Sequence, residues 1–90
     1  MALETVLASR TFARSERLKR LLQFISEAEI DGRGNELNEY TIGVKALDRP
    51  EGYSTSEDSS VRSRTYELRQ KLDRFYSTEA PRAEIRIELN

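Results

Sequence analysis

The chain has 90 residues, and its 15 lysines and arginines against 16 aspartates and glutamates give a formal net charge of −1. A near-neutral chain does not bind nucleic acid through bulk charge, so such binding would require local clusters of cations. Cysteine and histidine are absent, which excludes disulfides, zinc sites built on those residues and nucleophile–histidine pairs. We therefore expect a single domain over residues 1–90 that is not an enzyme and holds no cofactor or metal.

The sequence also bears on location. It contains no apolar run of about 18 residues, and its first residues lack the charged-then-apolar order of a signal peptide. The apolar fraction of 37% is modest, but the apolar residues are periodically spaced, which argues against disorder. We expect a folded cytoplasmic protein that does not interact with a membrane.

Two amphipathic segments are predicted in the first third of the chain. Residues 2–8 are predicted to form a short helix. In residues 15–30 apolar side chains recur at three- and four-residue intervals, which predicts a longer helix with Ser15 as its N-cap. The turn predicted at residues 31–35 contains two glycines that can adopt positive φ.

Two more helices are predicted in the second half. Residues 38–47 have helical apolar spacing, and Asn38 is a suitable N-cap. The polar segment 48–58 contains a proline and a glycine and is expected to be a loop. The strongest helical pattern follows over residues 58–76, where an apolar stripe continues for nearly four turns.

The end of the sequence has the pattern of a strand. Beyond Pro81, residues 83–89 alternate between apolar and charged side chains, which predicts a half-buried β-strand. A lone strand is not stable, so it needs a partner. We expect either a homodimer in which two C-terminal strands pair antiparallel or packing against an amino-terminal segment of the same chain.

The order of these elements predicts a mainly α fold, with a three-helix helix-turn-helix core followed by a short C-terminal β-strand. The three apolar stripes are expected to meet in one core. Its predicted members are Leu18, Leu22, Ile25, Tyr40, Val44, Val61, Leu68 and Leu72.

The stretch 61–72 resembles the recognition helix of the OmpR/PhoB-type response-regulator DNA-binding domains. In that family a Val or Ile is followed by an Arg-Leu-Arg-x-Lys-Leu run. The residues that match this run are Leu68, Arg69, Lys71 and Leu72. Glu67 takes the place of the first arginine. The resemblance implies a winged helix-turn-helix fold that binds DNA through this helix.

From Val6 to Leu89 the chain is more closely similar to an amino-terminal domain of large acidobacterial and other bacterial signalling proteins that carry tetratricopeptide or cyclase-like regions downstream. The matching residues are Phe12, Arg14, Ser15, Leu18, Leu22, Phe24, 39–44, Arg49, Pro50, Val61, Arg62, Leu68, Arg69, Lys71, Leu72, Tyr76 and 85–89. The Pro-Lys-Gly-Gly-Tyr-like wing tip and the amino-terminal sheet of response-regulator effectors have no counterpart in the sequence. We therefore expect a truncated winged helix.

A helix in the major groove needs side chains that reach base edges and cations that meet phosphates at its flanks. Arg69 and Gln70 suit guanine and adenine edges, whereas Lys71 and Arg74 are expected at phosphates. The predicted DNA-binding residues are Arg62, Ser63, Tyr66, Arg69, Gln70, Lys71 and Arg74, with Arg14 and Arg17 beside the helix. Double-stranded DNA is thus the predicted partner, and transcriptional regulation the predicted role.

Simpler interpretations stand beside this one. The charged residues of 61–74 also fit a solvated helix face with pairs such as Glu67 to Lys71. A role in solubility also fits the first basic cluster, which consists of Arg10, Arg14, Arg17, Lys19 and Arg20. Aromatic residues at helical spacing are more often in the core than stacked on bases. The residues concerned are Tyr40, Tyr66, Phe75 and Tyr76. The competing function is a protein–protein interaction or oligomerisation domain of a larger signalling protein.

Overall fold

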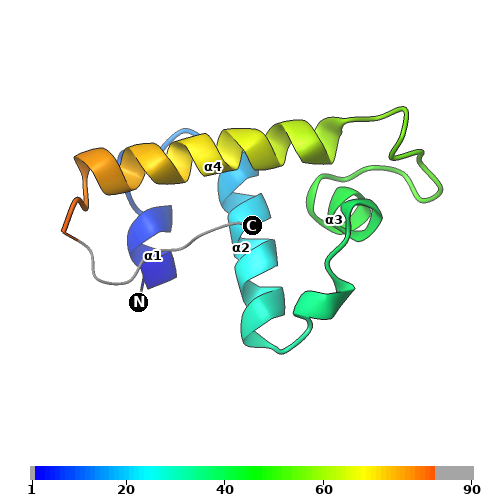
Figure 1. The fold of residues 1–90 in the computed structure, drawn as a ribbon, viewed down its shortest axis with the longest axis horizontal. Coiled ribbons are helices and arrows are strands. Elements are labelled where there is room, and N and C mark those ends of the chain that lie inside the picture. Colours follow the sequence, from blue (N-terminus) through cyan, green and yellow to red (C-terminus); the bar gives the residue numbers. More distant parts are fainter. Residues whose placement is uncertain (1, 83–90) are drawn as a thin grey trace.

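The computed structural model describes residues 2–82 and is mainly helical (Figure 1). Within these residues the elements, in chain order, are α1 (Ala2–Leu7), α2 (Glu16–Ile30), the 3-10 helix η1 (Gly34–Glu36), α3 (Glu39–Ala46) and α4 (Ser60–Thr78). The predicted helices are confirmed to within two residues at either end, and η1 was not predicted. The predicted strand at 83–89, and the dimer expected through it, lie outside the described residues.

The helix starts follow the capping chemistry only in part. The side chain of Asn38 accepts a hydrogen bond from the backbone N–H of Thr41 at 2.8 Å, as expected of an N-cap. Ser15 occupies the N-cap position of α2, but its side chain makes no capping hydrogen bond. Ahead of α4, Asp58 accepts from the backbone N–H of Ser60 at 2.9 Å, which is a tight side-chain turn just before the helix.

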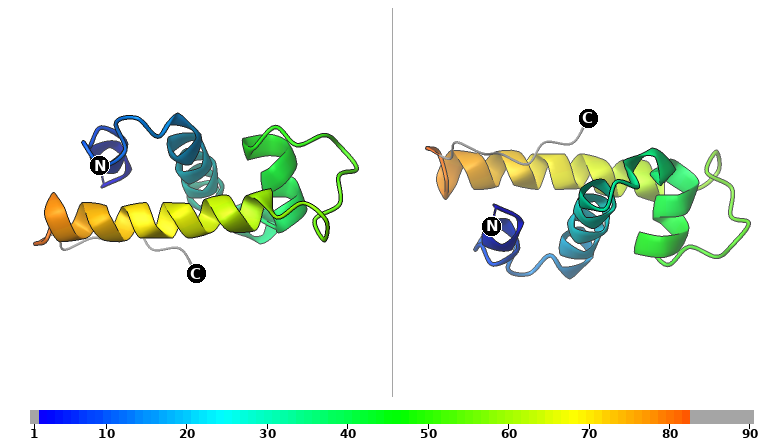
Figure 2. Two further views of the ribbon diagram at one scale, coloured as in Figure 1. Left: turned by 90° about the horizontal axis from the view of Figure 1, so that it is seen from above. Right: turned by 90° about the horizontal axis from the view of Figure 1, so that it is seen from below.

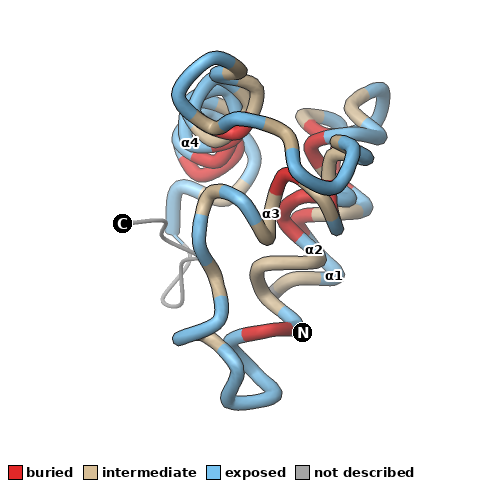
Figure 3. The backbone as a smooth tube through the Cα atoms, turned by 90° about the vertical axis from the view of Figure 1, so that its right-hand side faces the viewer, coloured by how far each residue is buried: buried red, intermediate tan, exposed pale blue. Residues whose placement is uncertain are grey.

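Helix α4 lies along one edge of the molecule, and the other helices pack on one side of it (Figures 1 and 2). Helix α2 crosses the middle of α4, with α1 toward the C-terminal end of α4 and α3 toward its N-terminal end. The residues that α4 buries are Val61, Leu68, Leu72, Phe75 and Tyr76. Figure 3 shows that buried positions gather where the helices meet, while the opposite side of α4 is exposed. One face of this helix therefore forms the core and the other meets solvent.

The predicted core is largely confirmed. Its buried members are Leu18, Leu22, Val61, Leu68 and Leu72. Ile25 is partly buried against the same cluster, and Val44 is half-buried. The core also contains Phe12, which is 0% exposed and lies between α1 and α2 in a segment without helical periodicity.

Two of the four aromatic residues that the simpler interpretation places in the core are exposed, and one of them, Tyr66, was also predicted at the DNA-binding surface. Phe75 and Tyr76 are buried as expected, but Tyr66 is 62% exposed and Tyr40 is 40% exposed. Tyr40 stays at the surface because its ring stacks on that of Tyr53, and its hydroxyl accepts a hydrogen bond from the backbone N–H of Gly52 at 2.7 Å. The placement of Tyr40 in the core was therefore wrong: it packs against the loop that follows α3.

The turn between α1 and α2 is fixed to α4 by two charged side chains. Glu79, just after α4, accepts from the backbone N–H groups of Arg10 at 3.1 Å and Thr11 at 2.7 Å, and from the Thr11 hydroxyl. The Nζ of Lys71 donates to the carbonyl oxygen of Thr11 at 3.1 Å. The Thr11 hydroxyl, together with the two N–H groups, lowers the pKa of the Glu79 carboxyl.

This lowered pKa predicts acid sensitivity. A carboxylate whose pKa is lower in the folded chain stabilises the fold fully above its unfolded pKa of about 4.3 and loses that effect as pH falls through the folded pKa. The stability difference between the parent and Glu79→Gln, measured by urea unfolding, should therefore shrink from pH 7 to pH 3. Glu57→Gln, at an exposed carboxylate outside this contact, serves as the control. A stability difference between the parent and Glu79→Gln that is equal at pH 7 and pH 3 would show that the Glu79 carboxylate does not make this contact.

The burial of Leu68 predicts a large effect of truncation. Its side chain is 0% exposed at the centre of the α4 stripe. Leu68→Ala should lower the free energy of unfolding by about 2 to 5 kcal/mol through lost burial and a residual cavity. The exposed neighbour Gln70→Ala should change it by less than about 0.5 kcal/mol. An unchanged urea midpoint for Leu68→Ala would show that this stripe does not face the core.

Candidate nucleic-acid interface

Most of the predicted DNA-binding residues share one side of α4. Arg62, Tyr66 and Arg69 are spaced by four and three residues, so they form one stripe along the helix. The exposed residues of this side, called here the outer face of α4, are Arg62, Ser63, Tyr66, Arg69, Gln70, Asp73 and Arg74. The outer face combines cations, amide and hydroxyl groups with the exposed ring of Tyr66.

Arg62 belongs to this face and also bonds two other segments of the chain. Its guanidinium donates to the Glu39 carboxylate at 2.7 Å and to the backbone carbonyl oxygen of Thr55 at 3.0 Å. It therefore links α4 to α3 and to the loop between them. A guanidinium has five N–H donors, so these bonds leave donors for a further partner.

The remaining three predicted residues lie at the flank of α4. Lys71 is half-buried, and its bond to the Thr11 carbonyl places it away from the outer face. Arg14 and Arg17 are exposed, and neither forms a hydrogen bond or ion pair through its side chain with another residue in 2–82. They line a shallow groove together with Arg64 and Lys71 of α4. The expected pair between Glu67 and Lys71 is replaced by one between Glu67 and Arg64.

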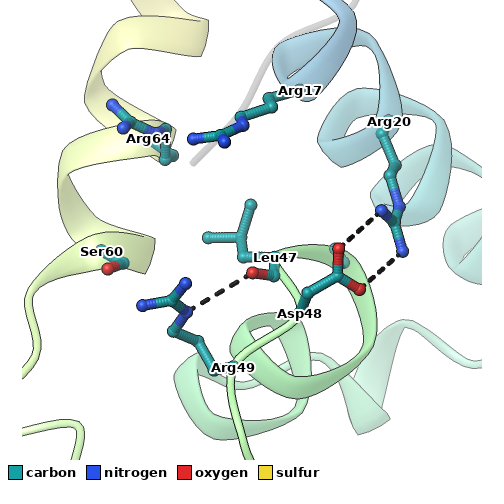
Figure 4. A pocket seen from close by; sticks show the side chains of 8 residues that line it. Arg17, Arg20, Leu47, Asp48, Arg49, Ser60 and Arg64 are labelled. Carbon is teal, nitrogen blue, oxygen red and sulfur yellow. Dashed lines mark hydrogen bonds and ion pairs between the residues drawn. The ribbon is translucent and has the colours of Figure 1, made fainter.

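A second cationic feature lies where α2, α3 and α4 meet. Four arginines line a surface pocket of about 210 Å³, called here the arginine pocket (Figure 4). The lining residues are Arg17, Arg20, Ala46, Leu47, Asp48, Arg49, Ser60 and Arg64. The four guanidinium groups thus come from helix α2, the segment after α3 and the first turns of α4.

The sequence prediction did not include Arg20, Arg49 or Arg64 among the site residues. Arg20 and Arg64 belong to basic stretches, and that local charge density was the only signal available for them. Arg49 stands alone beside Pro50, outside the basic stretches, and was named only among the residues that match the bacterial signalling-protein domain. Their proximity is a product of tertiary packing.

The end of α3 positions one side of the pocket. Asp48 has φ of 56°, the left-handed conformation that commonly ends a helix, and the backbone N–H of Arg49 bonds back to the Gly43 carbonyl at 2.9 Å. This conformation is unusual for a residue other than glycine. The Asp48 carboxylate receives two hydrogen bonds from Arg20, at 2.9 and 3.0 Å, which hold it in place.

The loop from residue 47 to residue 59 is held against α3 by Tyr53. Its ring lies 5.4 Å from that of Tyr40 between centroids, nearly parallel, and its hydroxyl donates to the Glu39 carbonyl oxygen at 3.0 Å. Burial of the phenol, with the nearby carboxylate of Glu39, raises the pKa of Tyr53. The ring lies against Gly43, where a Cβ would be only 2.0 Å from the Tyr53 hydroxyl oxygen. The close approach at Gly43 is therefore made by a loop tyrosine.

This contact predicts that Gly43→Ala changes the free energy of unfolding in opposite directions in the presence and in the absence of the Tyr53 ring. Gly43→Ala should destabilise the parent by about 1 to 3 kcal/mol, because the added methyl displaces the Tyr53 ring. In a Tyr53→Ala background the same change should stabilise by up to about 1 kcal/mol, because alanine is the better helix former. Urea unfolding of the four proteins measures both effects. An effect of the same sign in both backgrounds would show that Tyr53 does not occupy the space above Gly43.

Comparisons of the chain with protein-family models, with curated proteins and with solved structures found no match. Among the helices of residues 2–82, none has the length and apolar character needed to cross a membrane. The same residues contain no group of three or more acidic side chains placed to hold a metal ion.

Proposed function

We propose that this chain is a double-stranded-DNA-binding domain of the helix-turn-helix type, with α4 as the recognition helix. The outer face of α4 carries the proposal. It presents Arg62 and Arg69 on either side of Tyr66, whose ring is 62% exposed at the middle of the stripe. Exposed tyrosine and arginine on one rigid face are typical of a binding surface. A winged-helix fold with a strand at 83–89 belongs to the same proposal.

The shape of α4 fits the major groove. The groove admits an α-helix, and a helix of 19 residues is about 28 Å long, so part of it can lie in the groove while the rest packs on α2. Arg69 and Gln70 are suited to guanine and adenine edges. Arg62 bonds Glu39 and Thr55, and we assign base contacts to Arg69 and Gln70 on the chemistry of their donor groups.

The distribution of charge supports one orientation on DNA. Arg14 and Arg17 lie at the flank of α4, where phosphates would pass. The acidic residues Glu27, Glu29 and Asp31 lie at the C-terminal end of α2, which is remote from α4 (Figure 1). A chain with a net charge of −1 can therefore present a cationic side to DNA while its acidic end faces away.

Fluorescence anisotropy with a labelled duplex tests the proposal. The parent should bind random duplex at low salt, and binding should weaken steeply as salt rises because counterions are released from the phosphates. On a duplex selected for tight binding, Arg69→Ala with Gln70→Ala should cost about 1 to 3 kcal/mol per base contact. Arg14→Ala should reduce the salt slope by about one on any sequence.

Arg33→Ala is the matched control for these variants. It removes one exposed arginine from the turn after α2, at the end remote from α4, where its only described ion pair is with Asp31. Exposed pairs of this kind contribute little to stability. Parent-like duplex binding by the Arg69→Ala and Gln70→Ala double variant, or no salt-dependent binding by the parent, would overturn the proposal.

A protein-binding role is the second candidate, and the exposure of Tyr66 favours it to the same degree. Tyrosine and arginine anchor protein interfaces as readily as DNA contacts. Self-association through residues 83–89 belongs to this alternative, and light scattering measures it. A parent that dimerises or captures a protein through Tyr66, yet shows no salt-dependent duplex binding, would select the second candidate over the first.

A further inference from the structure

The arginine pocket concentrates positive charge beyond what its own carboxylates balance. Arg20 is paired with Asp48, Arg49 with Asp58 at 3.4 Å, and Arg64 with Glu67. Arg17 forms no such pair within the described residues, so the four arginines leave one positive charge in excess. The chain as a whole has a net charge of −1, so this local excess is opposite to the overall balance.

The side chains are arranged around a hollow (Figure 4). Arg17 extends from α2 toward Arg64 on α4, and Arg49 extends toward Ser60 at the start of α4. Arg20 turns to Asp48, and Leu47 lies between the arginines. A pocket of about 210 Å³ has room for a tetrahedral oxyanion and a few waters.

We propose that the arginine pocket binds a phosphate group. Guanidinium groups present planar forks of N–H donors that match phosphate oxygens, and bonds to an ionised acceptor are the strong ones. Three of the four arginines have a carboxylate partner, so the charge that a bound phosphate would balance is that of Arg17. Ser60, the first residue of α4, also lines the pocket, and its N–H and hydroxyl are bonded to Asp58.

The bond that Arg49 makes to Asp58 leaves it able to bind a phosphate group. The bond from Arg49 to Asp58 is long, at 3.4 Å, and the Asp58 carboxylate is also engaged by the hydroxyl and backbone N–H of Ser60. Arg49 therefore retains donors for a further acceptor. Arg17 retains all of its own, which makes it the residue whose loss should matter most.

Two sources can supply the phosphate group. One is the backbone of a bound duplex, since the pocket opens beside the start of α4. The other is a small phosphate-bearing molecule. The chemistry of recognition is the same for both, and the pocket proposal does not depend on DNA binding.

NMR of the arginine Nε–Hε groups in the full chain tests the proposal with inorganic phosphate as the probe. At constant ionic strength, phosphate should cause saturable shifts of Arg17, Arg49 and Arg64 that chloride does not cause. Arg17→Ala should weaken phosphate binding about tenfold or more, as expected for loss of one charge-assisted hydrogen bond. Arg33→Ala, which removes an equal charge remote from the pocket, should bind phosphate like the parent.

Thermal unfolding gives a second readout. Phosphate should raise the melting temperature of the parent above that in chloride of equal ionic strength, because it binds the folded state. Arg17→Ala should lose this increase and keep its helical circular dichroism, since Arg17 is exposed and makes no ion pair among residues 2–82. Shifts equal in phosphate and chloride, or an Arg17→Ala variant that binds phosphate as the parent does, would overturn the proposal.

A competition experiment separates the two sources. If adding duplex reverses the phosphate-induced shifts, the pocket holds a backbone phosphate; if phosphate and duplex bind together, it holds a small phosphate-bearing molecule. Both results uphold the pocket. The double variant Arg69→Ala with Gln70→Ala should lose duplex affinity while keeping phosphate binding. A parent that binds phosphate but no duplex would overturn the proposed function and leave the pocket standing.

Discussion

The packing of the apolar stripe of α4 on α2 determines which surfaces the rest of the chain can offer. Leu68 and Leu72 bury their side chains against the same cluster as Leu21 and Leu22, so the rotation of α4 about its own axis is fixed. The stripe covers only one side of a helix that has 3.6 residues per turn. Arg62, Tyr66 and Arg69 must then face outward, whatever they bind.

The start of α4 is fixed by the loop before it. Tyr53 attaches the loop to α3 by packing on Gly43 and Tyr40. Arg62, in the first turn of α4, bonds Glu39 of α3, so the start of α4 is attached to α3 as well. Without that attachment, Arg49 and the first turn of α4 would not be held beside Arg17 and Arg20 of α2. The arginine pocket is therefore a consequence of how the loop packs, although none of its arginines takes part in the tyrosine stack.

The sequence was sufficient for the helices because apolar spacing reports directly on which side of a helix is buried. It was not sufficient for residues whose surroundings come from other segments. Phe12 is fully buried in a stretch with no periodicity. Tyr40 fits the helical pattern, yet it stacks on Tyr53 of the following loop. The outer face of α4 could be predicted from its own spacing, whereas the arginine pocket could not, since its cations converge only after α2, α3 and α4 have packed.

The structure also separates two kinds of cation that the sequence presents alike. Lys71 and Arg20 are engaged with the protein itself, through the Thr11 carbonyl and the Asp48 carboxylate. Arg14 and Arg17 have no such partner in the described part of the chain and lie beside α4. Exposed ion pairs contribute about 0 to 1 kcal/mol each, so the engaged cations orient segments more than they stabilise the fold. The unengaged cations do neither, and they are the ones on which the proposed binding of phosphate groups depends.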